Sequence, residues 1–339
     1  MMGRGRGDNL MDGGQQSDLE TGLYSRRLRR KRSLTLVQKM SLLGRRYHKL
    51  PAPLVVCVSL SLSALLFVAV FMYNEAFGGQ FANVRVSNQL FAEHESPYKS
   101  LKTLVMVAGH SVYTSAKCEK PEDDDAWFLE SYQKHPGQAS SFVDHIRMGV
   151  EVAAGSEDSL LLFSGGETRL DAGPRSEGQS YWNVAESKDW YGRRESVRWR
   201  TLTEEFARDS FENLLFSMCR FRELTGHYPS NVTVVSYDFK QRRFTELHRH
   251  ALRFPEPQFS FVGVPIPSTN RIGAVEGEQK VLSMFQEDPY GCRGELRKKR
   301  ILRDPFLRAV PYPVGCPEMR GLFGYCGSDY YIGNLPWRP

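Results

Sequence analysis

Three short polar segments each follow a compact apolar run, and their residue types suit the binding of an anion. Glycines at such turns let the backbone approach a ligand, and N–H groups at a following helix start favour phosphate. One such turn is as well explained by the backbone geometry that glycine permits, but three together favour a binding site. The segments are Gly109-His110-Ser111, Ser164-Gly165-Gly166-Glu167-Thr168-Arg169 and Ser236-Tyr237-Asp238. Their candidate ligand-binding residues are Gly109, Ser164, Gly165, Gly166 and Ser236.

A dense group of carboxylates lies in the segment 204–213 (EEFARDSFEN). Glu205, Asp209 and Glu212 are spaced by four and three residues, which places them on one face if the segment is helical. Grouped carboxylates bind a divalent cation or raise one another's pKa for proton transfer. The alternative is a solvated helix face, but the poor helix formers Ser210 and Asn213 argue against it. The three carboxylates are therefore candidate catalytic residues.

Histidine adds a fourth candidate catalytic residue. His110 ends the first apolar run, where it can act as a base or ligand or can hydrogen-bond its own turn. His248 and His250 fall in a basic helical segment and are predicted to be solvated. No GxGxxG follows the first run, and neither GxxxxGK[ST] nor GxSxG occurs, which disfavours common dinucleotide enzymes, P-loop proteins and α/β-hydrolases.

The elements that must position these residues alternate between apolar runs and helical spacing. Such alternation predicts an α/β fold: a Rossmann-like, mostly parallel sheet with helices on both faces. Ligands of such sheets bind at the carboxyl ends of the strands, so the polar turns should meet along one rim. The predicted strands are 101–108, 159–163, 232–235 and 259–264, and the predicted helices are 139–154, 176–190, 204–224, 244–252 and 273–285.

An ordered set of sequence blocks over residues 101–265 resembles the domain-of-unknown-function 218 family, which includes bacterial ElyC, SanA and YdcF. The blocks are Gly109 after a strand, Ser164-Gly165-Gly166, Ser176-Glu177, Ala207-Arg208-Asp209-Ser210-Phe211-Glu212-Asn213, and Val232-Thr233-Val234-Val235-Ser236 followed by Arg243. The resemblance implies a Rossmann-like sheet, often behind a membrane anchor, with these blocks lining one cleft.

This chain departs from the family pattern at two places. Lys240 stands where the family has a His, with Arg243 retained three residues later, and Asp209-Ser210 stands where Asn and Thr are common. Lys240 and Arg243 can still pair with a phosphate. On the resemblance, Glu177, Ser210, Asn213, Lys240 and Arg243 join the ligand-binding candidates.

Positive charge is concentrated before the predicted domain. Residues 1–49 hold 12 Lys and Arg against 4 Asp and Glu, whereas the whole chain is only +6, so the remainder is close to −2. A nucleic-acid-binding protein would be expected to carry its positive charge on the folded domain. We therefore expect no nucleic-acid partner.

An uncharged apolar segment, 54–73 (LVVCVSLSLSALLFVAVFMY), follows this basic tail. Its length matches the roughly 30 Å hydrocarbon core and predicts a transmembrane signal anchor that binds the lipid bilayer. The flanking charges place the N-terminus in the cytosol. The short span favours a Golgi or ER membrane, and the Arg-rich tail leaves a mitochondrial membrane as the alternative.

The predicted organisation has five parts. They are a largely disordered basic tail (1–49), the anchor (50–73), a stem (74–99), the α/β domain (100–288) and an irregular Cys-containing extension (289–339). Five cysteines follow the anchor without CxxC spacing, which predicts one or two structural disulfides towards the C-terminus and a buried thiol.

Two functions fit these observations. The first is a hydrolase or transferase that acts on a phosphate- or nucleotide-type ligand in glycan or lipid-carrier metabolism. The second is a non-catalytic nucleotide-binding or scaffolding module at the Golgi or ER membrane. In either case the expected partner is a small anionic, phosphate-containing ligand, and no motif identifies a cofactor or a metal.

Overall fold

The computed structural model describes residues 56–72, 96–266 and 271–337. The chain divides into two compact units, Met1–Phe91 and Ala92–Pro339. The predicted tail 1–49 and all of the stem except residues 96–99 lie outside the described residues.

In the first unit, residues 56–72 form one helix whose side chains are exposed. No helix among the described residues combines the length and the apolar character that a membrane crossing requires. The predicted anchor, 54–73, extends beyond this described helix at both ends.

The second unit is built on a five-stranded sheet in which every pair of neighbours is parallel. The strand order is β5-β4-β1-β6-β7, so the chain winds outward from β1 in both directions, as in doubly wound folds. The prediction of an α/β fold with a mostly parallel sheet is confirmed. The strands are β1 (Thr103–Ala108), β4 (Ser159–Ser164), β5 (Thr201–Glu204), β6 (Asn231–Tyr237) and β7 (Phe259–Val264).

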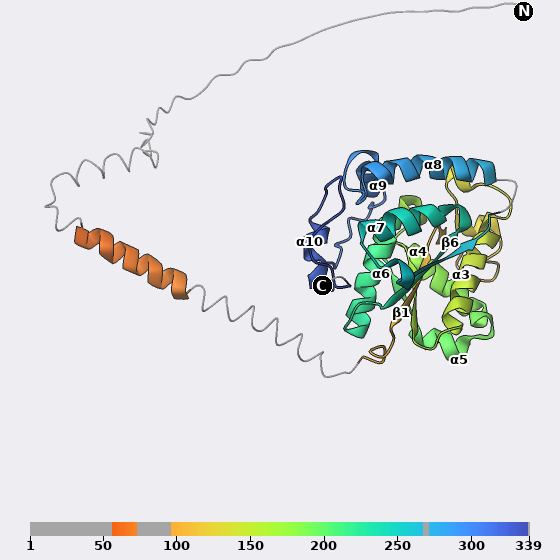
Figure 1. The fold of residues 1–339 in the computed structure, drawn as a ribbon, viewed down its shortest axis with the longest axis horizontal. Helices are drawn as coiled ribbons and strands as arrows, with labels where there is room; N and C mark the ends of the chain where they lie inside the picture. The colour runs from red at the N-terminus through yellow and green to blue at the C-terminus, as the bar shows by residue number, and fades with distance from the viewer. Residues whose placement is uncertain (1–55, 73–95, 267–270, 338–339) are drawn as a thin grey trace, which may run out of the picture. The chain divides into compact units, whose positions relative to one another are not determined.

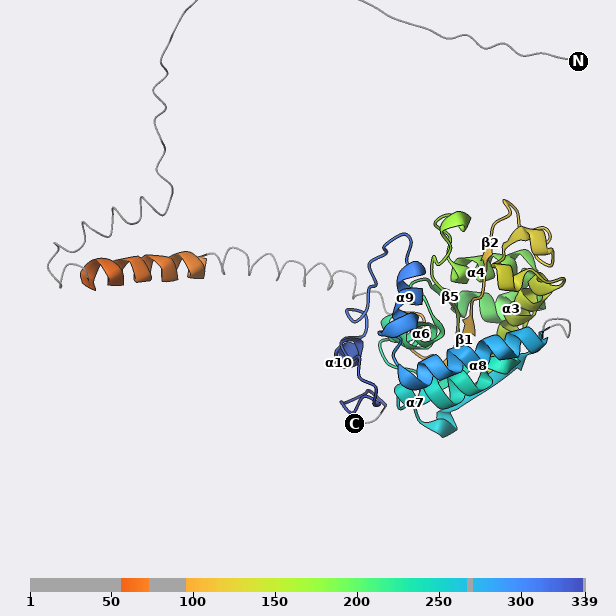
Figure 2. The ribbon, with the colours of Figure 1, turned by 90° about the horizontal axis from the view of Figure 1, so that it is seen from above.

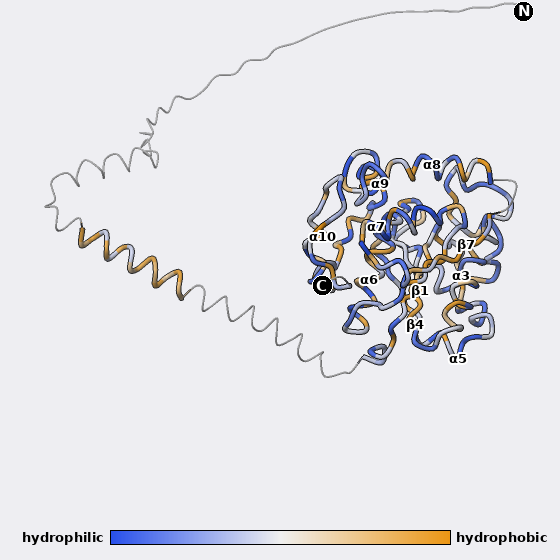
Figure 3. The backbone as a smooth tube through the Cα atoms, viewed as in Figure 1, coloured by the Kyte–Doolittle hydropathy of each residue, from blue (hydrophilic) through white to orange (hydrophobic). Residues whose placement is uncertain are grey.

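Helices cover both faces of this sheet (Figures 1 and 2). Successive residues of β1 point to opposite faces, so Val105 and Val107 pack in one core cluster while Leu104 and Met106 pack in another. α3 (Gln138–Ala154) and α4 (Glu177–Ser187) close the first cluster, and α6 (Ser210–Thr225) closes the second. The apolar strands therefore run through the middle of the unit, as the hydropathy colouring in Figure 3 shows.

The remaining elements are shorter or peripheral. β2 (Val112–Tyr113) pairs antiparallel with β3 (Trp127–Phe128). The other helices are α5 (Arg194–Val197), a π-helix (Arg243–His248) that continues into α7 (Arg249–Ala251), α8 (Arg271–Glu287), α9 (Gly294–Leu302) and α10 (Arg320–Phe323).

Most predicted elements are present, with three differences. The predicted helix 204–224 begins at Ser210, because Asp209 is its N-cap and accepts a hydrogen bond from the Glu212 N–H. Thr201–Glu204, farther before that cap, form the edge strand β5, which was not predicted. The predicted helix 244–252 is mostly the π-helix.

Two disulfides link residues 289–339 to the domain and to one another. They confirm the prediction of one or two structural disulfides towards the C-terminus. Cys219 of α6 is bonded to Cys316, and Cys292 is bonded to Cys326. Cys118 is a free thiol, but it is partly exposed and not buried as predicted. Side chains of this extension, including Leu296 and Met319, belong to the α6-side core.

Candidate functional site

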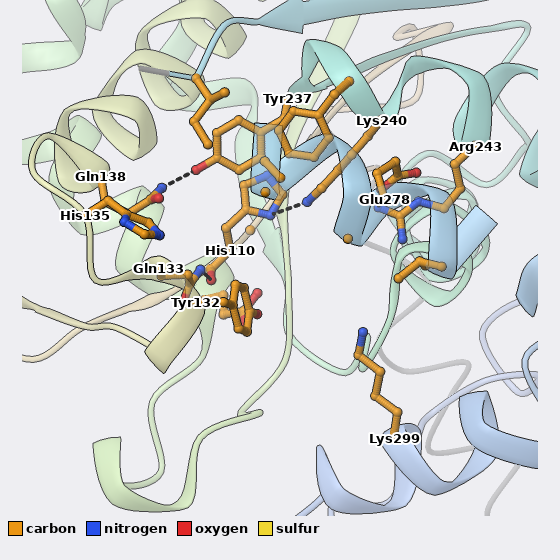
Figure 4. Close-up of a pocket in the computed structure, with 18 of the residues that line it drawn as sticks. His110, Tyr132, Gln133, His135, Gln138, Tyr237, Lys240, Arg243, Glu278 and Lys299 are labelled. Atoms are coloured by element: carbon orange, nitrogen blue, oxygen red, sulfur yellow. Dashed lines mark hydrogen bonds and ion pairs between the residues drawn. The ribbon is translucent and has the colours of Figure 1, made fainter. Parts of the chain in front are cut away.

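A cavity of about 550 Å³ lies over the carboxyl ends of β1 and β6. The chain leaves these neighbouring strands in opposite directions across the sheet, which makes this edge the topological switch point where ligands of open α/β sheets bind. Figure 4 shows its side chains pointing inward from separate elements. It is lined by Gly109, His110, Tyr132, Gln133, His135, Gln138, Arg169, Glu177, Tyr237, Phe239, Lys240, Arg243, Ile266, Gly273, Ala274, Gly277, Glu278, Val281, Lys299 and Arg303.

His110 follows β1 directly and lies at the inner end of the cavity. Its ring stacks on Tyr237, with 4.6 Å between ring centroids, and meets His145 edge-on at 5.0 Å. Its Nε2 lies 3.4 Å from the Ser236 hydroxyl, and its Nδ1 lies 3.4 Å from Lys240 Nζ. Burial, and then the charge of Lys240, lower the pKa of His110 well below its usual value. The imidazole is therefore neutral at physiological pH and can accept a proton or a hydrogen bond.

Lys240 closes the short turn after β6, and its ammonium group lies 5.0 Å from the centre of the Tyr237 ring. Burial, followed by repulsion from Arg243, lowers the pKa of Lys240 to about 7. In the described part of the chain, no carboxylate lies within ion-pair distance of this nitrogen. Lys240 is thus a cation whose charge an anionic ligand would stabilise.

Arg243 begins the π-helix, and its guanidinium faces Glu278 of α8 across 2.9 Å. Both side chains are buried, yet Arg243 Nε and Glu278 Oε1 have no hydrogen-bond partner among the described residues. A single ion pair leaves part of the hydrogen-bonding capacity of each group unused. The cavity wall therefore contains a buried donor and a buried acceptor whose hydrogen-bonding capacity is unused among the described residues.

Three further cations, Arg169, Lys299 and Arg303, line the cavity from other parts of the chain. Arg169 forms ion pairs with Glu130 and Glu177, whereas Lys299 of α9 has no carboxylate within 4 Å in the region that the structure describes. The Lys299 side chain is exposed at the rim of the cavity; partial desolvation by the surrounding residues, and then the charges of Arg303 and Arg243, lower its pKa to about 8. The lining thus combines five cationic side chains with the two carboxylates of Glu177 and Glu278, an excess that suits an anion.

Two glycines let Glu177 lie against the strand ends. A Cβ atom placed on Gly109 or on Gly165 would lie 2.7 Å from the Cβ of Glu177, so neither position has room for a side chain. Glu177 accepts a hydrogen bond from Thr168 at 2.6 Å. Glycine at these turns is thus required by close packing of helix α4.

The prediction that backbone N–H groups of Gly165 and Gly166 hold an anion is wrong. The Gly165 N–H donates to the Glu204 carbonyl at 3.0 Å, and the Gly166 N–H donates to the Ala207 carbonyl at 2.8 Å. These bonds join the turn after β4 to the segment after β5. The donors are already used in the fold, and neither glycine lines the cavity.

The predicted carboxylate face on one helix is also wrong. Glu205 precedes the helix and is held by the hydroxyls of Ser176 and Thr203 at 2.9 and 2.7 Å. Asp209 caps α6 and pairs with Arg300 at 2.6 Å, and Glu212 pairs with Arg208 at 2.8 Å. None of the three carboxylates lines the cavity.

The other predicted residues of this region also form hydrogen bonds within the protein. Ser164 donates to Glu204 at 2.7 Å and lies 3.2 Å from the Asn213 amide oxygen. The Ser210 hydroxyl lies 2.8 Å from His248 Nε2. His248 is therefore buried, against the prediction that it is solvated, whereas His250 is exposed as predicted.

Of the fourteen predicted site residues, the structure places five in the cavity lining: Gly109, His110, Glu177, Lys240 and Arg243. Ser236 lies just beneath, in contact with His110. The lining residues that were not predicted come mainly from the segment 132–138 and from α8 and α9. The basic run 297–300 is a sequence feature that could have indicated the cationic side chains contributed by α9. Across the residues that the structure describes, no cluster of His, Cys, Asp and Glu could hold a metal ion.

Comparison with known proteins gives one distant relative. The chain is similar to the uncharacterized protein YOR238W of Saccharomyces cerevisiae, with 26 % identity over 275 residues, which covers 63 % of this chain and 88 % of that protein. No family model matches the chain. No solved structure matches it either.

Proposed function

We propose that the α/β unit binds a small phosphate-bearing ligand in the cavity at the ends of β1 and β6. The observation that carries this proposal is that Lys240, Arg243, Lys299 and Arg303 line the cavity, whereas the carboxylates among its described lining residues are those of Glu177 and Glu278. Phosphate oxygens would complete the hydrogen bonds that these groups lack. Tyr237, Phe239 and Ile266 supply an apolar side for the rest of the ligand.

The arrangement of His110 and Lys240 supports a hydrolase or transferase activity. A neutral imidazole next to an amine with a pKa of about 7 provides a proton acceptor and a group that changes charge near neutral pH. In this proposal His110 accepts a proton from the attacking nucleophile, and the cations stabilise the charge that develops on the phosphate. A role in glycan or lipid-carrier metabolism belongs to the same proposal.

A second candidate is a binding module without catalysis. The specific observation in its favour is that both carboxylates of the lining are engaged in ion pairs, Glu177 with Arg169 and Glu278 with Arg243. Such a module would bind nucleotides without turning them over. Product release from each bound candidate, measured for the native chain and for His110→Ala, separates the two functions.

Anion binding is tested first with the full-length chain and inorganic pyrophosphate, by calorimetric titration. Lys299→Ala should weaken binding about fivefold, because the variant removes a cation from the lining. The matched control is Lys298→Ala, since the neighbouring Lys298 pairs with Glu295 outside the cavity. Equal affinities of both variants, or no binding by the native chain, would overturn the proposal.

Occlusion of the cavity gives an independent test. A Cβ on Gly277 of α8 would meet no atom within 4 Å, although this residue lines the cavity. Gly277→Leu should therefore fill the space and abolish pyrophosphate binding, while the higher helix propensity stabilises the fold by up to about 1 kcal/mol. Binding that persists in this stable variant would place the anion elsewhere.

We further propose that the chain belongs to the domain-of-unknown-function 218 family and is anchored through residues 54–73 in a Golgi or ER membrane. The ordered blocks and the flanking charges support these two points. Protease protection of residues 100–339 in sealed microsomes is the expected result. Digestion from the cytosolic side, or recovery in mitochondria, would contradict the location.

A further inference from the structure

Helix α9 and the turn after it expose large aliphatic side chains. Ile301 is 62 % exposed, Leu302 is 79 % exposed and Leu307 is 85 % exposed. In both views of the ribbon, α9 lies at the periphery of the unit beside α8 (Figures 1 and 2). Aliphatic groups that remain this exposed and lie close together mark a surface that a partner covers.

Positive charges are interleaved with these aliphatic groups. Helical spacing of three and four residues places Arg297 and Ile301, and likewise Lys298 and Leu302, on the outward side of α9. Leu296, which is buried, marks the inward side. The outward side of α9 is therefore amphipathic along its length, with cations beside aliphatic tips.

Few acidic groups balance this surface. Residues 293–308 contain two carboxylates, Glu295 and Asp304, and Asp304 is largely covered and bonded to Arg208 at 2.9 Å. Arg293 and Arg308, at the two ends of the segment, pair with Asp288 and Glu167, and the exposed Lys298 pairs with Glu295 at 2.7 Å. Arg297 has no ion-pair partner among the described residues, so it and the weakly held, exposed Lys298 are the cations that this surface presents. A neutral or basic protein partner would leave this charge unmatched, whereas an anionic lipid surface matches both the charges and the aliphatic groups.

We propose that residues 293–308, hereafter the α9 surface, dock on an anionic lipid bilayer. Ile301, Leu302 and Leu307 enter the boundary between headgroups and acyl chains, and Arg297 and Lys298 contact lipid phosphates and carboxylates. The same helix supplies Lys299 to the cavity lining. Docking therefore brings the cavity close to the plane of the headgroups. This inference goes beyond the proposed ligand function and does not depend on it.

The test measures amide hydrogen exchange of residues 294–308 in the full-length chain reconstituted into vesicles. Phosphatidylcholine vesicles are compared with vesicles that also contain phosphatidylserine, so that any membrane anchoring is common to both. Exchange in the α9 surface should be about fivefold slower on the anionic vesicles, while α3 is unaffected. About 0.5 M NaCl should remove most of the difference, because salt screens exposed charges.

Two double variants, one control variant and one competitor distinguish docking on lipid from other causes of protection. Arg297→Gln with Lys298→Gln should abolish the protection, and Ile301→Ser with Leu302→Ser should reduce it. Arg242→Gln, which alters an exposed cation of another element, should leave it unchanged. Identical exchange on the two kinds of vesicle overturns the proposal, as does protection by single-stranded RNA alone. Pyrophosphate binding by the cavity is measured on the same preparations, so its failure is distinguishable from failure to dock.

Discussion

Two neighbouring regions of this protein are rich in charge, and they differ in how completely the charges are paired. Around Asp209 and Glu212, each carboxylate is met by an arginine and also accepts a backbone N–H. Around Lys240 and Lys299, cations outnumber carboxylates, and polar atoms of Arg243 and Glu278 lack partners in the described structure. Both regions contain the residue types that catalysis requires, but in the second the cations of the described cavity lining outnumber its carboxylates, which favours an anionic ligand.

The directions of the pKa shifts also differ between the two regions. Burial acts to raise the pKa of Asp209, but the charge of Arg300 and the Glu212 N–H outweigh it, so that the pKa is lowered. Burial, and then repulsion from Asp209, raise the pKa of Glu212. In the cavity, by contrast, burial shifts the pKa of the cations downward towards neutrality. Ion pairing therefore favours the charged form of Asp209 in the first region, whereas a bound anion would favour the charged forms of the cavity cations in the second.

The largest expected effect comes from breaking the paired region. Glu212→Ala removes the partner of Arg208 and of Arg300, and should lower the free energy of unfolding by about 3–5 kcal/mol, as expected for a buried ion pair that loses one member. Urea denaturation measures this loss. Glu246→Ala, which breaks the exposed pair with Arg242, should cost less than about 1 kcal/mol.

The same experiment distinguishes a structural from a catalytic role of Glu212. Pyrophosphate affinity of the folded Glu212→Ala variant, measured at low temperature, should match that of the native chain. A stable variant that loses turnover of a phosphorylated compound would instead restore the carboxylates as catalytic groups.

A smaller effect is expected from Glu204, which accepts a hydrogen bond from Ser164 beside α6. Burial raises the pKa of Glu204 to about 8 despite hydrogen bonds from Ser164 and Phe206. The folded state then binds more protons than the unfolded state between the ordinary carboxyl pKa and 8, so this group's contribution to stability decreases as pH rises. Between pH 5 and 8, the native chain should lose about 3 kcal/mol relative to Glu204→Gln. Parallel pH dependences of the two proteins would contradict the raised pKa.

The smallest predicted effect concerns the charge of Lys240. Its pKa of about 7 means that it is protonated at pH 6 and largely neutral at pH 8. Sulfate, which does not titrate in this range, should bind up to about tenfold more tightly at pH 6 than at pH 8. In Lys240→Met most of this dependence should disappear, and a remainder of the same sign is expected from Lys299, whose pKa is about 8. An unchanged pH profile in the variant would exclude Lys240 as the responsible group.

The sheet could be predicted largely from the sequence because its central strands are buried on both faces. Continuous apolar runs such as Leu160–Phe163 have few alternatives to a strand between covering helices. The edge strand β5 was missed because its sequence, TLTE, is short and half polar. The start of α6 was misplaced because residues 204–209 share the carboxylates of the helix, although Asp209 and Glu212 have the spacing of a capping box.

The site was less predictable, for a different reason. His110 could be identified because strand ends in a parallel sheet must face one edge, and Lys240 was identified through the family resemblance. Glu278, Lys299 and Arg303 approach that edge only through the tertiary packing of α8 and α9, which local sequence patterns do not encode. Gly165 and Gly166, which follow β4, were correctly singled out from the sequence. Their role is to allow close packing of neighbouring segments, and they do not bind an anion.

The outer wall of the cavity is attached to the rest of the unit by few apolar side chains, in addition to ion pairs such as Arg243–Glu278 and Arg300–Asp209. The buried apolar residues of α8 are Leu282 and Phe285, and that of α9 is Leu296. The inner wall, in contrast, is formed by residues that directly follow core strands. Mutations on the cavity side of α8 and α9 can therefore accumulate at little cost to folding, and divergence among related chains is expected to change ligand preference there first, while the strand ends retain the same residues.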